Sequence, residues 1–302
     1  IVISKYKTEP INSSNTNQYT WTKQVAKLEK VPDSVKLESN QKENEFLESA
    51  NYNQGYFKNS EGKVIYNIIN EDNWSEVYTK EVNYTDKNGD TAKIPVGSKV
   101  SLAQTMNTVK KGLVIKDKND NEWVWVEVPK NKAFSGISID LTKELTEQNY
   151  KDIEDRMIEY ASTYREGKKS QGCDYKDEWY EGCGLSKEEY NNAYHSMLKS
   201  VYNYGGFWIG RYEAGIEGSV TDITKVRNSH SDLGTDKAII QKNAIPYNYI
   251  YCSEAQTLAN NLMQNVNYIS SLMFGIQWDL VCKYLEEGTD LTEKDINFDS
   301  SK

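Results

Sequence analysis

The chain has few of the residues from which catalytic and metal sites are built. It contains four cysteines and two histidines in 302 residues. No two cysteines have the C-x-x-C spacing of a structural zinc site, so we expect no metal and no cofactor. The histidines, His195 and His230, are the only side chains that act as ordinary bases at neutral pH. We therefore predict no catalytic residues.

Neither histidine has the sequence context of a catalytic base. His195 follows Tyr194 on a predicted helix, which favours a partly exposed structural role. His230 lies in the run Ser-His-Ser-Asp at 229–232, which contains the residue types of a catalytic triad. Adjacent residues cannot form the nucleophile, base and orienter geometry, so we interpret this run as a polar loop.

Basic patches and long apolar runs are also missing. The net charge of -9 argues against a nucleic-acid partner, because proteins that bind nucleic acids concentrate Lys and Arg. No run approaches the ~18 apolar residues of a membrane span. The chain begins at Ile1 rather than Met, so we expect membrane attachment only through a segment upstream of Ile1.

Tyrosine, in contrast, is abundant. The chain has 22 tyrosines, seven tryptophans and six phenylalanines. A tyrosine buries its ring while its hydroxyl stays hydrated, so it suits both a core and a binding surface. The length fits one large domain or two ordinary ones.

The first part of the chain divides into a leader and a β-rich region. Residues 1–60 are rich in Asn, Ser, Lys and Glu, which predicts an extended or partly helical leader. Strand signals run from 61 to 130. The run 64–69 reads as a strand, and 86–90 reads as a tight turn with Asn-Gly at its centre.

A hairpin is predicted from 112 to 128. The runs 112–116 and 122–128 flank a polar turn, and Pro129 ends the second strand because it cannot donate a main-chain hydrogen bond. Residues 123–126 are apolar on both faces, which predicts an interior strand.

The turn of this hairpin carries oxygen-bearing side chains at alternate positions. Asp117, Asn119 and Asn121, with Glu122 next, have the alternation of a calcium loop. They lack the central Gly and the distant Glu of an EF-hand, so we interpret them as a plain hairpin turn and leave calcium binding open. The turn at 86–90 receives the same interpretation.

Two helices are predicted within 131–204. Ser186 and Glu189 form a capping box at the start of the second helix, and Gly205 ends it. One face of the first helix is apolar. Its residues are Tyr150, Ile153, Met157, Ala161 and Tyr164.

The last hundred residues predict a strand at 207–212, a polar loop at 216–244 and two further helices. The first helix follows 253 and buries Ala255, Leu258, Ala259 and Leu262. The second ends at Gly288 and buries Ile276, Leu280, Val281, Tyr284 and Leu285.

Four runs in this order carry a family resemblance. They are Trp123–Pro129, Phe207–Glu213, Ser253–Ala255, and Leu272 followed by Gln277–Asp279. Together they resemble the formylglycine-generating-enzyme (sulfatase-modifying-factor) branch of the C-type-lectin-like fold. The resemblance implies an α+β domain over 61–302: a β-rich start at 61–130, a helical insertion at 131–204 and a motif-bearing part at 205–302.

The chain departs from this family after the fourth run. The later Asn-Val-Trp-Glu-Trp-like run, the final Arg-Gly-Gly-Ser-like strand and the copper-holding cysteines of the oxidases have no counterpart. We therefore expect the C-terminal half of the family domain to be missing from the sequence.

The resemblance is greatest to pilin-like or prophage-borne surface proteins of gut Firmicutes, some of them varied by diversity-generating retroelements. It implies a non-catalytic extracellular scaffold for binding, display or cell adhesion, on a bacterial surface or a phage particle. The expected partner is an unknown protein or glycan, or the chain itself in a filament. One alternative is an oxidase of the formylglycine-generating type whose catalytic half is absent. Another is a purely structural filament subunit.

Five residues of the matched runs are expected to be structural. Arg211 and Glu213 share one face of a strand and predict an internal ion pair. Trp208 belongs to the same strand. Trp278 is expected in the core, and Asp279 as a buried hydrogen-bond acceptor.

Four loop residues are candidates for ligand contact. Trp179 and Tyr180 lie in one polar loop, and Arg227 and His230 lie in another. Loops on a rigid scaffold usually carry recognition, which is the general reason for choosing them.

The cysteines fall into two pairs. Cys173 and Cys183 flank a polar loop, and their spacing suits a disulfide in an oxidising compartment. Cys252 and Cys282 lie on predicted helices with apolar neighbours, so we expect buried thiols.

Overall fold

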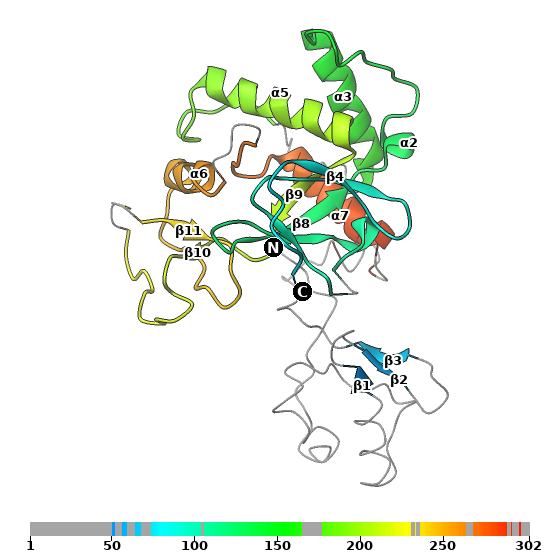
Figure 1. The fold of residues 1–302 in the computed structure, drawn as a ribbon. Helices are drawn as coiled ribbons and strands as arrows, with labels where there is room; N and C mark the ends of the chain where they lie inside the picture. Colours follow the sequence, from blue (N-terminus) through cyan, green and yellow to red (C-terminus); the bar gives the residue numbers. More distant parts are fainter. Residues whose placement is uncertain are drawn as a thin grey trace.

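The computed structural model describes residues 74–103, 106–164, 177–230, 233, 236–263, 268–288, 291 and 296, and the backbone of strands β1–β3. Most of the expected leader lies outside the described residues. Helices and small antiparallel sheets are combined in the described part, as in an α+β fold (Figure 1).

The main sheet has four antiparallel strands in the order β6-β7-β8-β9. They are β6 (Lys99–Val100), β7 (Val114–Lys116), β8 (Glu122–Glu127) and β9 (Gly206–Gly210). β8 lies inside the sheet, which confirms both the hairpin and the interior strand expected from its apolar faces. β9 is an edge strand and is shorter than the predicted run.

Three smaller sheets are formed by strands that come before or after the main-sheet strands in the sequence. β1 (Ala50–Asn51), β2 (Tyr56–Lys58) and β3 (Val64–Asn67) form a three-stranded sheet. β4 (Val82–Thr85) and β5 (Thr91–Ile94) form a hairpin around the tight turn predicted at 86–90. β10 (Gly215–Ile216) and β11 (Ala238–Ile239) pair inside the region predicted as a polar loop.

The turn between β7 and β8 is held by Asp117. Its Oδ1 accepts from the main-chain N–H of Asn119 at 2.8 Å and of Asn121 at 3.0 Å. Its Oδ2 accepts from the Asn121 amide and from the Trp123 indole, each at 3.1 Å. Both carboxylate oxygens therefore stabilise the turn, which supports the plain hairpin interpretation.

The segment 131–204 is mainly helical, as predicted. It contains most of α2 (Lys130–Ala133), all of α3 (Glu147–Tyr160) and α5 (Lys187–Tyr204). The capping box of Ser186 and Glu189 is formed, and Gly205 ends α5 with φ of 72°, a left-handed conformation that glycine adopts without strain.

Three further helical segments are the short 3-10 helix η3 (Val109–Lys111), α6 (Cys252–Asn260) and α7 (Gly275–Gly288). The carboxylate of Asp177 accepts from the N–H groups of Gly275 at 2.7 Å and Ile276 at 3.0 Å. It thus satisfies two N–H groups at the start of α7, which otherwise lack partners.

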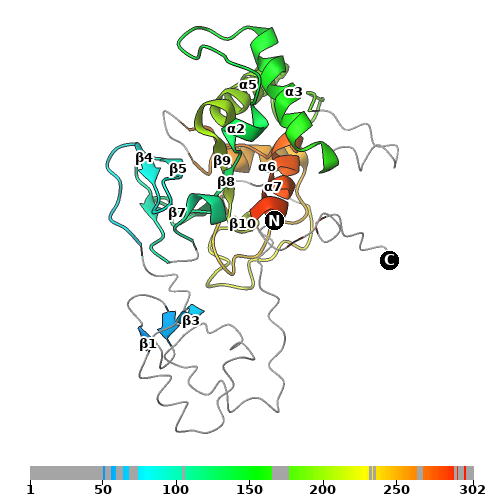
Figure 2. The same cartoon turned by 90° about the vertical axis from the view of Figure 1, so that its right-hand side faces the viewer.

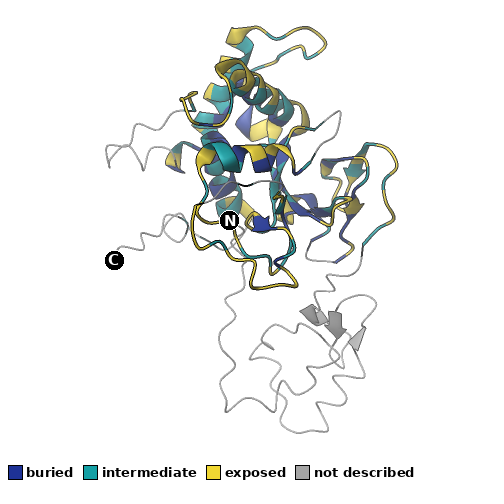
Figure 3. Ribbon diagram, turned by 90° about the vertical axis from the view of Figure 1, so that its left-hand side faces the viewer, coloured by how far each residue is buried: buried dark blue, intermediate teal, exposed yellow. Residues whose placement is uncertain are grey.

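Two hydrophobic cores lie on opposite faces of the main sheet, because successive side chains of a strand alternate. Val126 and Phe207 belong to the core that contains buried residues of the helices, and Trp123 and Trp125 belong to the core that contains Ile94 of the β4–β5 hairpin. Figure 2 shows this hairpin on one side of the strands β8 and β9. The buried residues concentrate along the sheet and the inner faces of the helices (Figure 3).

No helix within the described ranges is both long and apolar enough to span a bilayer.

Candidate binding surface and an internal cavity

Two of the predicted ligand-loop residues, Tyr180 and His230, contact the start of α6. The Tyr180 hydroxyl donates to the Cys252 sulfur at 2.9 Å. The His230 ring lies 3.8 Å from the Tyr251 ring between centroids, and its Nε2 lies 3.1 Å from Glu254 Oε2. Two loops about fifty residues apart in sequence therefore meet at one helix terminus.

Trp179, which lies in the same loop as Tyr180, is also fixed by a hydrogen bond. Trp179 donates its indole N–H to the Leu185 carbonyl at 2.9 Å. Arg227 donates to the Tyr249 carbonyl at 3.3 Å and lies 3.7 Å from Asp236. Because the Arg227 side chain is only 9% exposed, it holds the loop and is not the exposed ligand contact that we expected.

We call Trp179, Tyr180, His230, Tyr249 and Tyr251 the loop surface. Their rings are partly or largely exposed, with Tyr180 at 53%, Tyr249 at 54% and Tyr251 at 63%. Tyr249 has φ of 50°, which is uncommon for a residue other than glycine. Such strained residues concentrate at functional sites, where the surrounding structure holds them in place.

The Tyr180 hydroxyl of the loop surface stays protonated at neutral pH. The hydrogen bond to the Cys252 sulfur, with burial and the nearby Cys183, raises the pKa of Tyr180 to about 12. Tyr180 therefore remains a hydrogen-bond donor at every physiological pH.

One of the cysteine expectations is wrong. Cys252 is exposed, because it is the first residue of α6 and lies beside the exposed Tyr251. Cys282 is buried, as expected from its place on α7. Cys183 is buried too, but Cys173 lies outside the described residues, so their disulfide stays a prediction.

His195 has the structural role that its context indicated. Its ring stacks on the Tyr150 ring with centroids 3.9 Å apart and an interplanar angle of 4°. Its Nε2 lies 3.6 Å from Glu147 Oε2. These contacts join α5 to α3.

The ion pair predicted at Arg211 exists with a different partner. Arg211 Nη1 donates to Glu122 Oε2 at 2.5 Å, between two residues that are both largely buried. Glu213 is exposed, so the expected Arg211–Glu213 pair is wrong. β9 ends at Gly210, and Arg211 lies beside the first residue of β8.

The other matched residues differ in burial. Asp279 is buried, as expected. Trp278 is only partly buried and is not one of the buried core residues. Trp208 donates its indole N–H to the Lys93 carbonyl at 2.9 Å and packs edge-on against Trp125.

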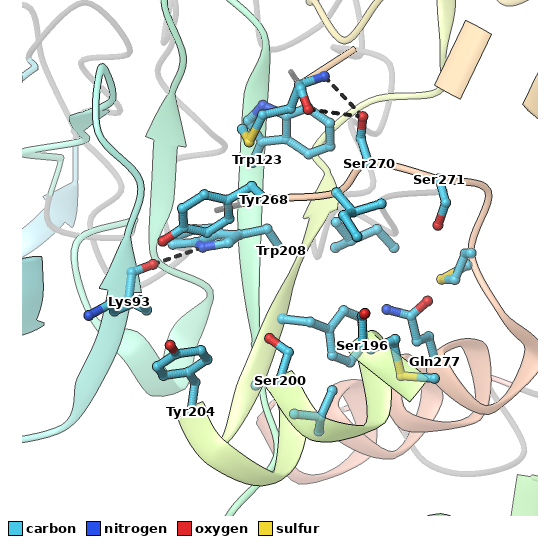
Figure 4. A pocket seen from close by; sticks show the side chains of 18 of the residues that line it. Lys93, Trp123, Ser196, Ser200, Tyr204, Trp208, Tyr268, Ser270, Ser271 and Gln277 are labelled. Atoms are coloured by element: carbon cyan, nitrogen blue, oxygen red, sulfur yellow. Dashed lines mark hydrogen bonds between the residues drawn. The ribbon is translucent and has the colours of Figure 1, made fainter. Parts of the chain in front are cut away.

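A cavity of about 580 Å³ lies between β9, α5 and the segment 268–277 (Figure 4). Trp208, Tyr268 and Tyr204 line one part of it, and Ser200 and Gln277 line another. No local pattern in the sequence indicates this cavity, because its residues come from distant segments.

No group of three or more His, Cys, Asp and Glu side chains in the described part is placed to hold a metal ion.

Comparison with known proteins gives no match: no family model fits the sequence, and neither curated proteins nor solved structures match it.

Proposed function

We propose that the chain is a non-catalytic scaffold that binds a partner protein through the loop surface. The observation that supports this most is the meeting of Tyr180 and His230 at the start of α6, although they come from separate loops. The sequence nominates both as ligand-contact candidates, because both lie in polar loops.

The chemistry of the loop surface suits a protein partner. Tyr and Trp are enriched among the residues that dominate binding energy at protein interfaces. A tyrosine held by other contacts presents a large ring at a low cost in conformational entropy. The exposed rings of Tyr180 and Tyr251 meet this description, because neighbouring residues contact both.

The setting of this activity comes from the family resemblance. We propose a C-type-lectin-like domain of the formylglycine-generating-enzyme branch, displayed on a bacterial surface or a phage particle. The oxidase and the filament subunit remain the alternatives. If the chain is part of an oxidase, Cys252 is accessible to solvent and Cys282 is not, since Cys252 is exposed and Cys282 is buried.

The experiment uses a photo-cross-linking amino acid at position 251. The protein is irradiated with a surface-protein extract from gut bacteria, and cross-linked species are identified by mass spectrometry. We expect a discrete partner from position 251 and none from position 191, an exposed site on α5. Equal labelling from both positions, or copper-dependent conversion of a peptide cysteine, would contradict the proposal.

A further inference from the structure

The cavity beside β9 is distinct from the loop surface, and the two share no residue. Its volume of about 580 Å³ lies within the range of ligand-binding pockets, roughly 300–1,000 Å³. Helix α5 forms one wall, and the segment 268–277 forms another (Figure 4).

Every residue of β9 lines this cavity. β9 is the last strand in the order β6-β7-β8-β9, so one of its sides pairs with β8. No described strand pairs with its other side. An open strand edge of this kind presents main-chain donors and acceptors that can pair with another chain.

The hydrogen bonds to β8 show which main-chain groups of β9 are open. Arg211 N–H donates to the Glu122 carbonyl at 2.9 Å, and Val128 N–H donates to the Gly205 carbonyl at 2.8 Å. In an antiparallel pair this pattern alternates, so odd-numbered residues of this run point their main-chain groups toward β8. The outward groups belong to Gly206, Trp208 and Gly210, and no main-chain bond among the described residues uses them.

The open edge is fixed in position by the core behind it. Trp208 is held by its bond to the Lys93 carbonyl and by the Trp125 ring, 5.1 Å away between centroids. A Cβ atom at Gly206 would lie 2.5 Å from the Trp125 ring, so only glycine fits there. A fixed edge lowers the entropy cost of binding a further strand.

The wall opposite β9 offers uncharged polar groups. Ser196 and Ser200 project from α5, and among the described residues neither hydroxyl has a hydrogen-bond partner. Gln277 uses its Oε1 to accept from Phe274 N–H at 3.0 Å, which leaves its amide N–H groups available. These groups can bond a main-chain carbonyl or a small polar side chain.

The charged groups of the cavity neutralise each other. Lys93 Nζ lies 2.7 Å from Glu81 Oε1, and Tyr268 donates to Glu81 Oε2 at 2.9 Å. Burial opposes the ionised form of Glu81, but these two partners outweigh it and lower its pKa. The cavity therefore favours a ligand without net charge, because it offers no unpaired charge to bind one.

We propose that this cavity receives an extended, uncharged peptide segment of a partner protein, which adds to the open edge of β9 as a fifth strand. Main-chain bonds to Gly206, Trp208 and Gly210 supply affinity in this mode of binding, and alternate side chains supply specificity. The outward groups recur every second residue, about 6.8 Å apart, which is the repeat of a paired strand.

The first test selects ligands from a displayed library of random linear peptides. We expect enriched peptides with an uncharged central stretch. Their affinity should fall at least roughly tenfold for Ser200→Trp, which fills the cavity from α5. Asn191→Trp, on an exposed part of the same helix, and Tyr251→Ala, on the loop surface, should keep wild-type affinity.

The second test does not depend on a protein variant. Each main-chain nitrogen of the selected peptide is methylated in turn, and binding is measured by calorimetry. Methylation at every second position should remove one hydrogen bond to β9 and weaken binding roughly tenfold. Methylation at the positions in between should change the affinity little.

Three outcomes would overturn the proposal: a peptide that binds Ser200→Trp as well as wild type, uniform tolerance of methylation, or no enrichment. Saturable binding of maltose instead, blocked by Ser200→Trp, would identify a sugar site and also overturn it. Because Tyr251→Ala is a separate control, failure here is distinguishable from failure of the loop surface.

Discussion

On the loop surface, the rings of Tyr180, His230 and Tyr251 each have a contact that limits their motion. Tyr180 is tied through its hydroxyl to Cys252, and His230 lies against the Tyr251 ring. The main-chain N–H of Tyr251 donates to Glu254 Oε2 at 2.8 Å. Binding therefore requires little further ordering of these side chains, which preserves more of the contact energy as affinity.

The different exposure of Cys252 and Cys282 predicts different rates of alkylation. Native protein treated with iodoacetamide should be modified quickly at Cys252, which is exposed, and slowly at Cys282, which is buried. Peptide mapping by mass spectrometry reads each position separately. Cys252→Ser should remove the fast phase, and equal rates at the two thiols would show that the burial of Cys282 is wrong.

Asp86 gives a prediction about pH. Its Oδ1 accepts from the N–H groups of Asn88 and Asp90, and its Oδ2 accepts from Val109 N–H. Burial raises the pKa of Asp86, but these bonds and Lys110 outweigh it, so the net pKa lies below its usual 3.8. Asp86→Asn should therefore lower the free energy of unfolding at pH 7 by about 1–3 kcal/mol.

The sign of the pH effect follows from the lowered pKa. The unfolded state takes up the Asp86 proton at a higher pH than the folded state, so this stabilisation is present above 3.8 and is lost below it. Urea titrations across pH should show the wild type and Asp86→Asn converging as pH falls below 3.8. A constant gap down to the lowest pH would contradict this account.

At the scale of elements, local signals in the sequence predict where helices begin and end. The Ser186–Glu189 box and Gly205 bound α5, because capping uses only residues within one turn. The antiparallel pair of β10 and β11 is not predicted by the sequence, since two-residue strands leave no alternation to detect. The expectation that Trp278 is a core residue rested on its residue type, which cannot distinguish partial from full burial.

The cap of α5 provides a stability test. Ser186 Oγ accepts from Glu189 N–H at 3.2 Å, and Glu189 Oε2 accepts from Ser186 N–H at 2.8 Å. Ser186→Ala removes the first bond and should cost about 0.5–2 kcal/mol of stability, measured by thermal unfolding. Ser196→Ala, at an exposed position in the same helix, should change stability little, and equal losses would argue against the cap.

At the scale of the whole molecule, the decisive contacts join residues far apart in the chain. Arg211 and Glu122 are 89 residues apart, and Tyr180 and Cys252 are 72 apart. Strand alternation suggested Glu213 as the partner of Arg211, but the sheet register placed Glu122 there. The loop residues could be nominated from the sequence, whereas their meeting at α6 depends on packing that no local pattern encodes.

The most direct test of the loop surface is a calorimetric titration of the partner captured from position 251. Tyr180→Ala and Tyr251→Ala should each weaken its binding at least roughly tenfold, as expected for residues that dominate an interface. Ser200→Trp, in the cavity, should bind with wild-type affinity. Wild-type affinity in both alanine variants, with their folds intact by circular dichroism, would contradict the central claim that this surface binds the partner.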